Sequence, residues 1–235
     1  MRILDVTTSL LTSLGRLGQG HAVGAIGRRP EKPLILYEYE ACPFCRKVRE
    51  ALTALDLQAD IRPCPRGGER FRPDVIAQGG REQFPYLVDP NTNVALYESD
   101  AIVRHLFDHY GSEKVPTLLR LGPLGDLNST LSGLPRALAG RSAQPSQVPG
   151  SPLELYSMES SPFCRLVREC LSELEIPYHL HNVGRGSPSR EEFIQRSGRM
   201  MVPWLADPNS GVEMFESAEI VKYLKMTYGQ ESSNP

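Results

Sequence analysis

Hydrophobic and polar residues alternate with two different periods along the chain, and the same order of periods occurs twice. Residues 34–39 (LILYEY) alternate and are rich in β-forming side chains, which predicts a strand. The next segment has apolar residues at helical spacing, with Pro43 suited to a first helical turn. The apolar series of this predicted helix is Phe44, Val48, Leu52 and Leu55. Weaker patterns predict a strand at 57–63, a helix at 71–78, a hairpin over 85–99 and a helix ending at Gly111.

The second half of the chain repeats the text of the first half. Residues 33–52 align with 152–171 at an offset of 119, and residues 83–111 align with 201–229 at an offset of 118. A match of this length with one single-residue gap predicts two copies of one α/β domain. The repeated text also predicts the same order of strands and helices in both copies.

The boundaries of the copies divide the chain into four parts. We expect an N-terminal extension at 1–32, a first domain at 33–115, a linker at 116–150 that could contain a helix, and a second domain at 151–232. The text at 4–18 resembles that at 125–140, so each copy could carry its own prefix. The Gly-, Pro- and Ser-rich segments that follow these prefixes, at 27–33 and 140–152, are predicted to be loops. The alternative is that the prefixes are merely flexible.

Composition excludes several classes of partner. The formal net charge is −2 and the hydrophobic share is 40%, so we expect neither nucleic acid nor an anionic membrane as a partner. No apolar run approaches the roughly 20 residues that span a bilayer. The first residues lack the pattern of a secretory signal. We therefore expect a soluble cytoplasmic protein, or one of an organelle stroma after removal of a transit peptide.

The segment CPFC, from Cys42 to Cys45, carries the candidate chemistry. A Cys-x-x-Cys pair between a strand and a helix is typical of thiol–disulfide chemistry. Cys42 would begin the helix, where free N–H groups and the helix dipole stabilise a thiolate. Cys45, one turn later, could resolve a mixed disulfide. Zinc binding and an inert packed pair are the alternatives, although zinc usually needs four ligands.

The residues after the cysteines add positive charge. Arg46 and Lys47 could stabilise the thiolate, or they could simply form a solvated helix face.

Three linked motifs carry a family resemblance. Each copy has a Cys/Ser-Pro-Phe helix start, a proline after the middle helix, and a Glu-Ser pair at the last helix. With these motifs each copy resembles the N-terminal, thioredoxin-fold domain of glutathione S-transferases, and CPFC resembles glutaredoxins and the glutaredoxin-like module of membrane-associated prostaglandin E synthase. The resemblance implies an α/β fold of two tandem thioredoxin-like domains, each a mixed four-stranded sheet flanked by helices.

The resemblance also implies a glutathione site in the first copy. Pro85 would follow a cis peptide bond, and the backbone of Phe84 would pair with the cysteinyl part of glutathione. Glu98 and Ser99 would hold the γ-glutamyl end, in agreement with the backbone donors of a helix N-terminus. The alternative is that this pair only caps the helix. Arg81 could meet the glycyl carboxylate or could be solvated.

The second copy differs at its helix start, because Ser161 replaces the first cysteine and Cys164 keeps the second. A hydroxyl cannot form a disulfide, so this copy is predicted to bind glutathione or to support the first copy. Plant-type transferases with Ser-Pro-Phe use such a serine to hold the glutathione thiolate. The remaining candidates in this copy are Val202, Pro203, Glu216 and Ser217, with Arg199 equivalent to the arginine of the first copy.

Glutathione-linked thiol–disulfide exchange is therefore the predicted function. Cys42 would attack a protein or small-molecule disulfide, and Cys45 or a second glutathione would resolve the product. Glutathione is expected as co-substrate, with no metal. The alternatives are a non-catalytic scaffold of the same fold, or a glutathione-dependent transferase, isomerase or peroxide reductase. Conjugation is not favoured, since the all-helical domain of full transferases is not evident in the sequence.

Other candidate residues have simpler interpretations. Cys64 is expected in a basic loop, either as a second reactive thiol or as an incidental cysteine. Cys170 and Trp204 are expected in the core. Four histidines are expected at the surface or at helix caps: His105, His109, His179 and His181.

Overall fold

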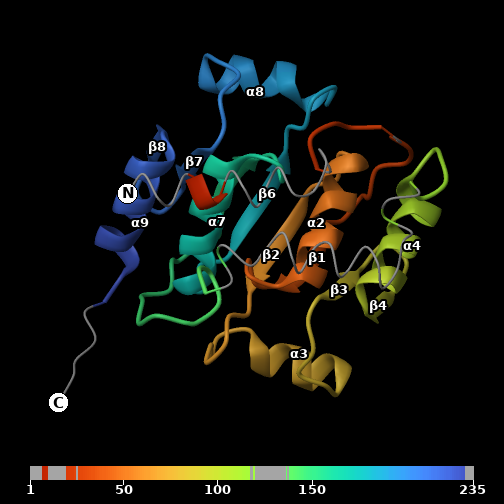
Figure 1. Cartoon of the computed structure of the whole chain (residues 1–235), viewed down its shortest axis with the longest axis horizontal. Helices are drawn as coiled ribbons and strands as arrows, with labels where there is room; N and C mark the ends of the chain where they lie inside the picture. The colour runs from red at the N-terminus through yellow and green to blue at the C-terminus, as the bar shows by residue number, and fades with distance from the viewer. Residues whose placement is uncertain are drawn as a thin grey trace.

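The computed structural model describes residues 7–9, 20–24, 26–116, 119, 136 and 138–230. Figure 1 shows the two copies side by side, the first in orange to yellow-green and the second in teal to blue. The elements of the first copy are β1 (Leu34–Glu38), α2 (Pro43–Ala54), β2 (Ala59–Pro63), α3 (Arg72–Gly79), β3 (Tyr86–Asp89), β4 (Val94–Tyr97) and α4 (Ser99–Tyr110). The elements of the second copy are β5 (Leu153–Ser157), α7 (Pro162–Glu173), β6 (Tyr178–Asn182), α8 (Ser189–Ser197), β7 (Trp204–Asp207), β8 (Val212–Phe215) and α9 (Ser217–Tyr228).

All the named strands form one eight-stranded sheet in the order β4-β3-β1-β2-β6-β5-β7-β8. Within each copy the first two strands are parallel and the remaining pairs are antiparallel, so both predicted mixed four-stranded sheets are present. The copies join where β2 runs antiparallel to β6, with Ile61 opposite Tyr178. This joined sheet is a feature that the sequence analysis does not include.

The apolar faces of α2, α4, α7 and α9 cover one face of the sheet with a single core. Leu36, Val48 and Leu106 of the first copy belong to the same buried cluster as Leu155 and Leu171 of the second copy. Burial of such side chains, at roughly 25 cal/mol per Å² of apolar surface, is the main stabilising contribution. Figure 1 places α2 and α7 near the centre and α4 and α9 at opposite sides. Phe44 does not join the core as predicted, because its side chain at the first helical turn is 43% exposed.

Two smaller clusters lie under the remaining helices, on the other face. In the first copy Cys64 lies in the loop after β2, as predicted, but it is fully buried beside Val75 of α3 and so is not an exposed reactive group. In the second copy Trp204 packs against Phe193 of α8, which confirms the expected core position. Cys170 is also in the core, within the large cluster, as predicted.

The segments before the two copies, 20–33 and 138–152, are called the connectors. Each connector contacts first the other copy and then the copy that it precedes. The Gly20 carbonyl accepts a hydrogen bond from Ser160 N–H in the second copy, and Gly24 N–H then donates to Ala54 in the first. The second connector does the same in reverse, because Ala143 N–H donates to Arg66 and Gln144 N–H to Glu173. In these described parts the connectors are held by hydrogen bonds. The prefixes at 4–18 and 125–140, for which flexibility is the alternative, lie largely outside the described residues. The helix considered for 116–150 falls largely outside the described residues.

Two glycines allow the crossings. Gly20 and Gly140 both have positive φ, of 69° and 71°, which favours glycine. A β-carbon at Gly20 would lie 2.7 Å from Cβ of Glu159, and one at Gly140 would lie 2.9 Å from Cβ of Glu40. Each connector therefore lies directly against a glutamate of the opposite copy.

The histidines are less uniform than predicted. His105 is buried, with Nε2 2.8 Å from Asp89 Oδ2, so a surface or cap position is wrong for it. His109, His179 and His181 keep partial exposure, and Nδ1 of His179 lies 2.5 Å from Asp60 across the β2–β6 junction.

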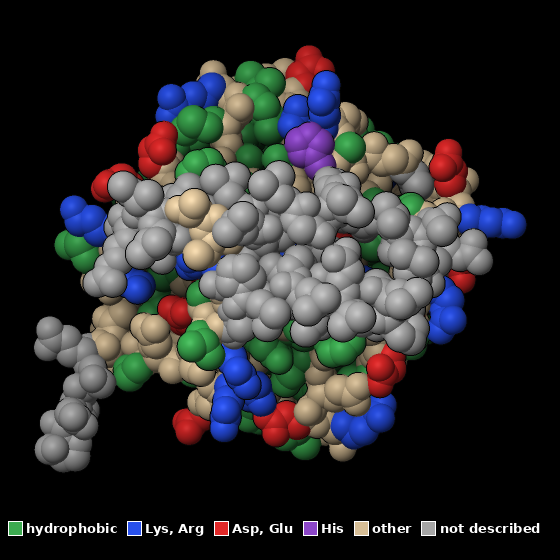
Figure 2. Space-filling model, in the orientation of Figure 1, with side chains coloured by type: hydrophobic (Ala, Val, Ile, Leu, Met, Phe, Trp, Pro, Cys, Tyr) green, Lys and Arg blue, Asp and Glu red, His purple; other side chains and the backbone are tan. Residues whose placement is uncertain are grey.

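Charges of both signs are mixed around the edge of the face shown in Figure 2. Such mixing gives no strong field of one sign. Among the described residues, no helix is long and apolar enough to cross a bilayer.

Candidate functional site

The CPFC segment lies where the sequence predicts it, between β1 and the first turn of α2. Cys42 is the N-cap residue of the helix, and Pro43 occupies the first turn. The Cys42 Sγ accepts a hydrogen bond from the backbone N–H of Cys45 at 3.2 Å. This sulfur therefore takes the position that a capping oxygen usually fills, facing the free N–H groups of the helix.

The two thiols have opposite tendencies to ionise. Burial raises the pKa of Cys42, but hydrogen bonds from Cys45 and from the N–H groups of the helix start outweigh it and hold that pKa below its ordinary value. The pKa of Cys45 is raised well above normal, first by burial and then by its interactions with Cys42. At neutral pH the first sulfur of the pair is the better nucleophile and the second holds its proton.

Both thiols are enclosed. Cys42 is 3% exposed and Cys45 is fully buried, whereas the neighbouring Phe44 is 43% exposed. No group of three or more potential metal-binding side chains occurs among the described residues.

The other predicted residues of the first copy lie near the start of α4 and of β3. The Phe84–Pro85 peptide bond is cis, as the family resemblance implies. The Phe84 ring packs edge to face against the ring of Tyr39, with the ring centroids 6.3 Å apart. Tyr39 lies three residues before Cys42. This contact brings the proline segment to the loop that carries the first cysteine.

Glu98 and Ser99 begin α4 but do not cap it in the usual way. Glu98 is the N-cap residue at a φ of 66° and makes no side-chain cap hydrogen bond. Its carboxylate instead accepts a hydrogen bond from Gln83 Nε2 at 2.6 Å. Lys47 of α2 pairs with Asp100 at 2.5 Å and so ties this helix start to the CPFC helix. The exposed Glu98 carboxylate is thus available beside a helix N-terminus.

The two arginines stack on aromatic rings. The Arg81 guanidinium lies over the ring of Tyr97 at 4.6 Å, and Arg199 lies over Phe215 at 4.3 Å. Such cation–π contacts orient each arginine beside the β-hairpin of its copy.

The second copy reproduces the geometry with an oxygen. Ser161 Oγ accepts a hydrogen bond from Cys164 N–H at 3.3 Å, and Glu216 has a φ of 69°. The Val202–Pro203 bond is also cis. Burial raises the pKa of Cys164. Ser9 lies against this helix start and donates from Oγ to the Pro162 carbonyl at 2.8 Å.

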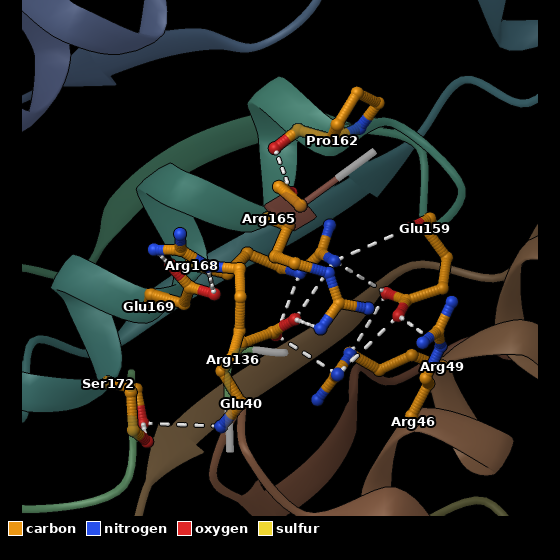
Figure 3. Close-up of polar contacts among 12 residues, drawn as sticks. Glu40, Arg46, Arg49, Arg136, Glu159, Pro162, Arg165, Arg168, Glu169 and Ser172 are labelled. Atoms are coloured by element: carbon orange, nitrogen blue, oxygen red, sulfur yellow. Dashed lines mark hydrogen bonds and ion pairs between the residues drawn. The ribbon is translucent and has the colours of Figure 1, made fainter. Parts of the chain in front are cut away.

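A buried set of ion pairs links the two helix starts, as Figure 3 shows. Arg49 of α2 contacts Glu40 of its own copy and Glu159 of the other, and Arg168 of α7 contacts the same two glutamates. All four nitrogen–oxygen distances are 3.0 Å. We call these four residues the arginine–glutamate ring. Because every member is buried, these pairs are shielded from solvent.

This ring is not predicted from the sequence, and two residues beside it lie elsewhere than predicted. Arg46 and Lys47 are both buried, so the interpretation as a solvated face is wrong. Arg46 Nε lies 3.3 Å from Glu50 and 3.8 Å from Glu159. The sequence does carry one signal for this ring, because arginines and glutamates recur at equivalent positions of both copies. A helix face that only meets solvent would not need the same charged residues in both copies.

One carboxyl group has no counterpart in the second copy. Glu38, the last residue of β1, pairs with Arg49, and its equivalent at the end of β5 is Ser157. Burial raises the pKa of Glu38 to about 7 despite the arginine, whereas Arg168 and Arg49 outweigh burial and hold the pKa of Glu40 at about 2. The additional acid therefore sits in the copy whose helix start carries two cysteines.

Comparison with known proteins identifies the class to which this fold and site belong. The family described as glutathione S-transferase, N-terminal domain, matches residues 36–118 and again 155–232. The chain belongs to this family, and the thioredoxin-like fold predicted for both copies is confirmed.

Each individual relative matches this chain over about the length of one domain. The chain is 30% identical over 80 residues to the glutathione S-transferase-like protein OpS6 of Beauveria bassiana, covering 34% of this chain and 37% of that protein. It is 33% identical over 79 residues to the glutathione S-transferase-like protein tpcF of Aspergillus fumigatus, covering 34% of each. Both matches span little more than a third of the relatives' own length. A solved structure of Bombyx mori glutathione transferase BmGSTD1 matches with 25% identity and a TM-score of 0.34, over 40% of this chain and 45% of that chain.

Proposed function

We propose that the protein is a glutathione-linked thiol–disulfide oxidoreductase that acts through Cys42. The Cys42 thiolate attacks a disulfide that contains glutathione, forms a Cys42–glutathione mixed disulfide and releases the other thiolate. A second glutathione thiolate then attacks the glutathione sulfur of that bond, so that glutathione disulfide leaves and the Cys42 thiolate returns. Each step exchanges one S–S bond for another, and glutathione supplies both electrons.

The position of Cys42 Sγ at the N-cap of α2, where it accepts a hydrogen bond from Cys45 N–H at 3.2 Å, is the observation that carries this proposal. A sulfur held as a thiolate at a helix start is a nucleophile, and a protonated sulfur one turn away is a resolving group. An inert packed pair would not require the hydrogen bond from Cys45 N–H to Cys42 Sγ. A zinc site is not supported either, since the described residues hold no suitable group of ligands.

The neighbouring residues support a glutathione site of the family's kind. The Phe84 backbone before the cis proline offers a pairing edge, and the exposed Glu98 carboxylate, which accepts from Gln83 Nε2, suits the ligand's ammonium group. The N–H groups at Ser99 suit its α-carboxylate. Arg81, which stacks on Tyr97, is the cation that we assign to the glycyl end.

The second copy has a supporting role in this proposal. Ser161 repeats the capping geometry of Cys42, so it could hydrogen-bond a glutathione thiolate, but it cannot form a covalent bond with sulfur. Val202, Pro203, Glu216 and Ser217 would form the rest of that site, with Cys164 buried beneath it.

The enclosure of Cys42 favours small disulfides as substrates over folded protein surfaces. A sulfur with 3% exposure in its residue can meet the narrow sulfur end of a glutathione conjugate. A protein disulfide would reach it only on an extended segment.

A reductase assay tests the proposal. The mixed disulfide of glutathione and mercaptoethanol is the substrate, and glutathione consumption is followed with wild type, Cys42→Ser, Cys45→Ser and Cys170→Ala. We expect Cys42→Ser to fall to the uncatalysed rate and Cys45→Ser to retain turnover through the second glutathione. Cys170→Ala is the control, because this core cysteine is equivalent to Ala51. Turnover by Cys42→Ser equal to that of wild type would contradict the proposal.

A non-catalytic glutathione-binding scaffold is the second candidate, and the burial of Cys42 favours it. The two are distinguished by calorimetric titration of glutathione alongside the assay. Binding that survives in Cys42→Ser, in a protein with no reductase turnover, would establish the scaffold.

A further inference from the structure

A cavity of about 510 Å³ lies beside the β2–β6 junction, and we call it the junction cavity. Its walls come from three separate parts of the chain, namely the first connector, the strands of the junction and the start of α8. The lining includes Arg29, Lys32, Asp60, His179, His181 and Ser189, and none of the residues assigned to thiol chemistry or to glutathione. Cavities of roughly 300–1,000 Å³ are typical of sites for small molecules.

The floor of the junction cavity is the centre of the junction. Asp60 and His179 occupy equivalent positions of the two copies and lie opposite each other in the strand register. Their neighbours Ile61 and Leu180 belong to the large core, so Asp60 and His179 face the other side of the sheet. Oδ1 of Asp60 lies 2.5 Å from Nδ1 of His179. Oδ2 makes no hydrogen bond to any other described residue, and the Asp60 side chain is 22% exposed.

The equivalent region in the other half of the molecule is closed by the chain itself. Asp56 and Glu175 are equivalent turn residues, with φ of 54° and 49°. The Glu175 carboxylate accepts hydrogen bonds from the backbone N–H groups of Glu69 and Arg70, at 3.3 and 3.1 Å. The Arg70 guanidinium also donates to the Ser146 carbonyl of the second connector. The loop before α3 therefore bridges the turn and the connector.

The loop before α8 does not make this bridge. Counted from the glycine with positive φ in each loop, Pro188 and Ser189 take the places of the two N–H donors. Proline has no N–H, and Ser189 N–H donates to Ser187 Oγ at 3.1 Å. Burial raises the pKa of Asp56, and the nearby hydroxyls of Ser187 and Ser189 only partly offset this. Asp56 Oδ1 has no hydrogen-bond partner among the described residues, so the space beside Ser189 stays open as the junction cavity.

The first connector places two cations at this cavity, and they differ in their partners. Arg29 donates to the Asp56 carbonyl at 2.6 Å and to its carboxylate at 2.9 Å, so its charge is already balanced. Lys32 makes no ion pair with any other described residue. Its backbone is fixed, because its N–H donates to Asn91 Oδ1 at 2.8 Å and its carbonyl accepts from Asn91 Nδ2 at 3.0 Å. The Lys32 ammonium group is thus the unpaired positive charge of the cavity.

The remaining charged groups of the lining have partners of their own. Glu31 pairs within the connector at 3.6 Å, and His181 lies 2.6 Å from Glu154. Two groups are left for a ligand, the ammonium group of Lys32 on the connector wall and Oδ2 of Asp60 on the floor. They have opposite charges and lie on different walls.

We propose that the junction cavity binds a zwitterion, an α-amino acid or a short peptide, with its ammonium group at Asp60 and its carboxylate at Lys32. A ligand with both charges pairs with both walls, whereas a ligand with one charge leaves a desolvated group on the other wall. The body of the ligand would lie against Pro30 and Pro33, which also line the cavity. This site needs no thiol, so it goes beyond the proposed function and does not depend on it.

Calorimetric titration of the full chain with alanine, alanylglycine and trialanine tests the proposal and separates a free amino acid from a peptide as the ligand. We expect at least one of the three to bind. N-acetylation or C-terminal amidation of that ligand should weaken binding by about tenfold or more, because each removes one hydrogen-bonded charge. No binding of any of the three at millimolar concentration overturns the proposal. Binding of the acetylated or the amidated form as tight as that of the free ligand does so too.

Two variants assign the ends of the ligand to residues. Asp60→Asn should weaken the free ligand and leave the N-acetylated form unchanged, and Lys32→Gln should weaken the free ligand and leave the amidated form unchanged. Lys222→Gln, at an exposed lysine of α9 outside the cavity, is the matched control and should bind as wild type does. Wild-type affinity of the free ligand for both Asp60→Asn and Lys32→Gln would overturn the assignment.

A third variant locates the ligand. Ser189→Arg introduces the type of side chain that closes the other half, so it should abolish binding. Circular dichroism without ligand checks that each variant is folded, and the titrations of wild type with modified ligands need no variant. Undiminished binding by folded Ser189→Arg would place the ligand elsewhere, including at the residues assigned to glutathione, and would overturn the proposal.

Discussion

Single positions decide how the two copies differ in chemistry. Cys42 and Ser161 make the same hydrogen bond to the N–H three residues later, at 3.2 and 3.3 Å. The backbone thus presents either atom in the same way, and the difference in chemistry comes only from whether that atom is sulfur or oxygen. Sulfur can form a disulfide and oxygen cannot.

Glu38 also predicts a pH dependence of stability. Its pKa is about 7 in the folded chain against 4.5 ordinarily, so the folded state binds this proton more tightly. The associated stability is complete below pH 4.5 and is lost as the pH rises through 7. We expect the unfolding free energy of wild type to fall relative to Glu38→Gln by roughly 3 kcal/mol across that range.

Urea unfolding at pH 4, 5.5, 7 and 8 checks this expectation. Glu213→Gln, at a half-exposed position, is the control and should run parallel to wild type. A constant difference between wild type and Glu38→Gln at all four pH values would show that this carboxyl group does not titrate with folding.

The sequence predicted individual residues well where a local motif defines them. Cys42 and Pro43 are at the helix start, both motif prolines follow cis bonds, and Trp204 is buried. It failed where polar side chains are buried by segments that are distant along the chain. Arg46, Lys47 and His105 are charged or polar positions that the chain covers with distant segments, and no local pattern indicates such cover.

At the scale of elements, α2 and α7 depend on each other through their charges. Each helix supplies one arginine to the glutamate that precedes the other helix. Such pairs contribute little net stability compared with apolar side chains, but loss of one partner leaves a buried charge uncompensated.

Arg168→Met tests this dependence. Glu40 and Glu159 would each lose a 3.0 Å contact, and we expect a loss of about 3–5 kcal/mol in unfolding free energy. Arg196→Met on α8 is the control for an exposed ion pair, since that arginine is 42% exposed and its ion-pair distances are 3.6 and 3.8 Å. It should cost less than about 1 kcal/mol.

Calorimetry or urea unfolding measures both variants. Addition of Glu40→Gln to Arg168→Met should recover part of the loss, because it removes a buried charge that had lost one of its partners. Equal stability of Arg168→Met and wild type would mean that the pairs are not shielded from water.

The order and type of elements in each copy were predictable, because period and turn signals are local. The hairpin, for example, turns at Asp89-Pro90-Asn91, and Asp89 Oδ1 accepts from Asn91 N–H at 2.9 Å. The β2–β6 junction was not predictable, because neither strand differs in pattern from a strand at a sheet edge. Pairing across 119 residues depends on the approach of the two folded copies.

At the scale of the whole molecule, the junction turns two small sheets into one. The core cluster runs through it, from Ile61 on one side to Leu180 on the other. The two crossing connectors add hydrogen bonds in both directions. We therefore expect the two copies to unfold as one cooperative unit.

Hydrogen exchange followed by mass spectrometry tests this expectation. The amides of β2 and β6 lie in the middle of the sheet and should be among the last to exchange, while β4 and β8, at its two ends, should exchange first. Fast exchange of β2 and β6, at the rate of β4 and β8, would indicate that the copies separate in solution.

The β2–β6 junction joins halves that are alike in shape but are separate stretches of one polypeptide. In an assembly of two identical chains, every substitution would appear on both sides of the symmetry axis. Here a substitution changes one side alone. Ser at positions 157 and 161 can therefore coexist with Glu38 and Cys42 in every molecule, at a fixed one-to-one ratio, so a specialised half always has an unspecialised half beside it.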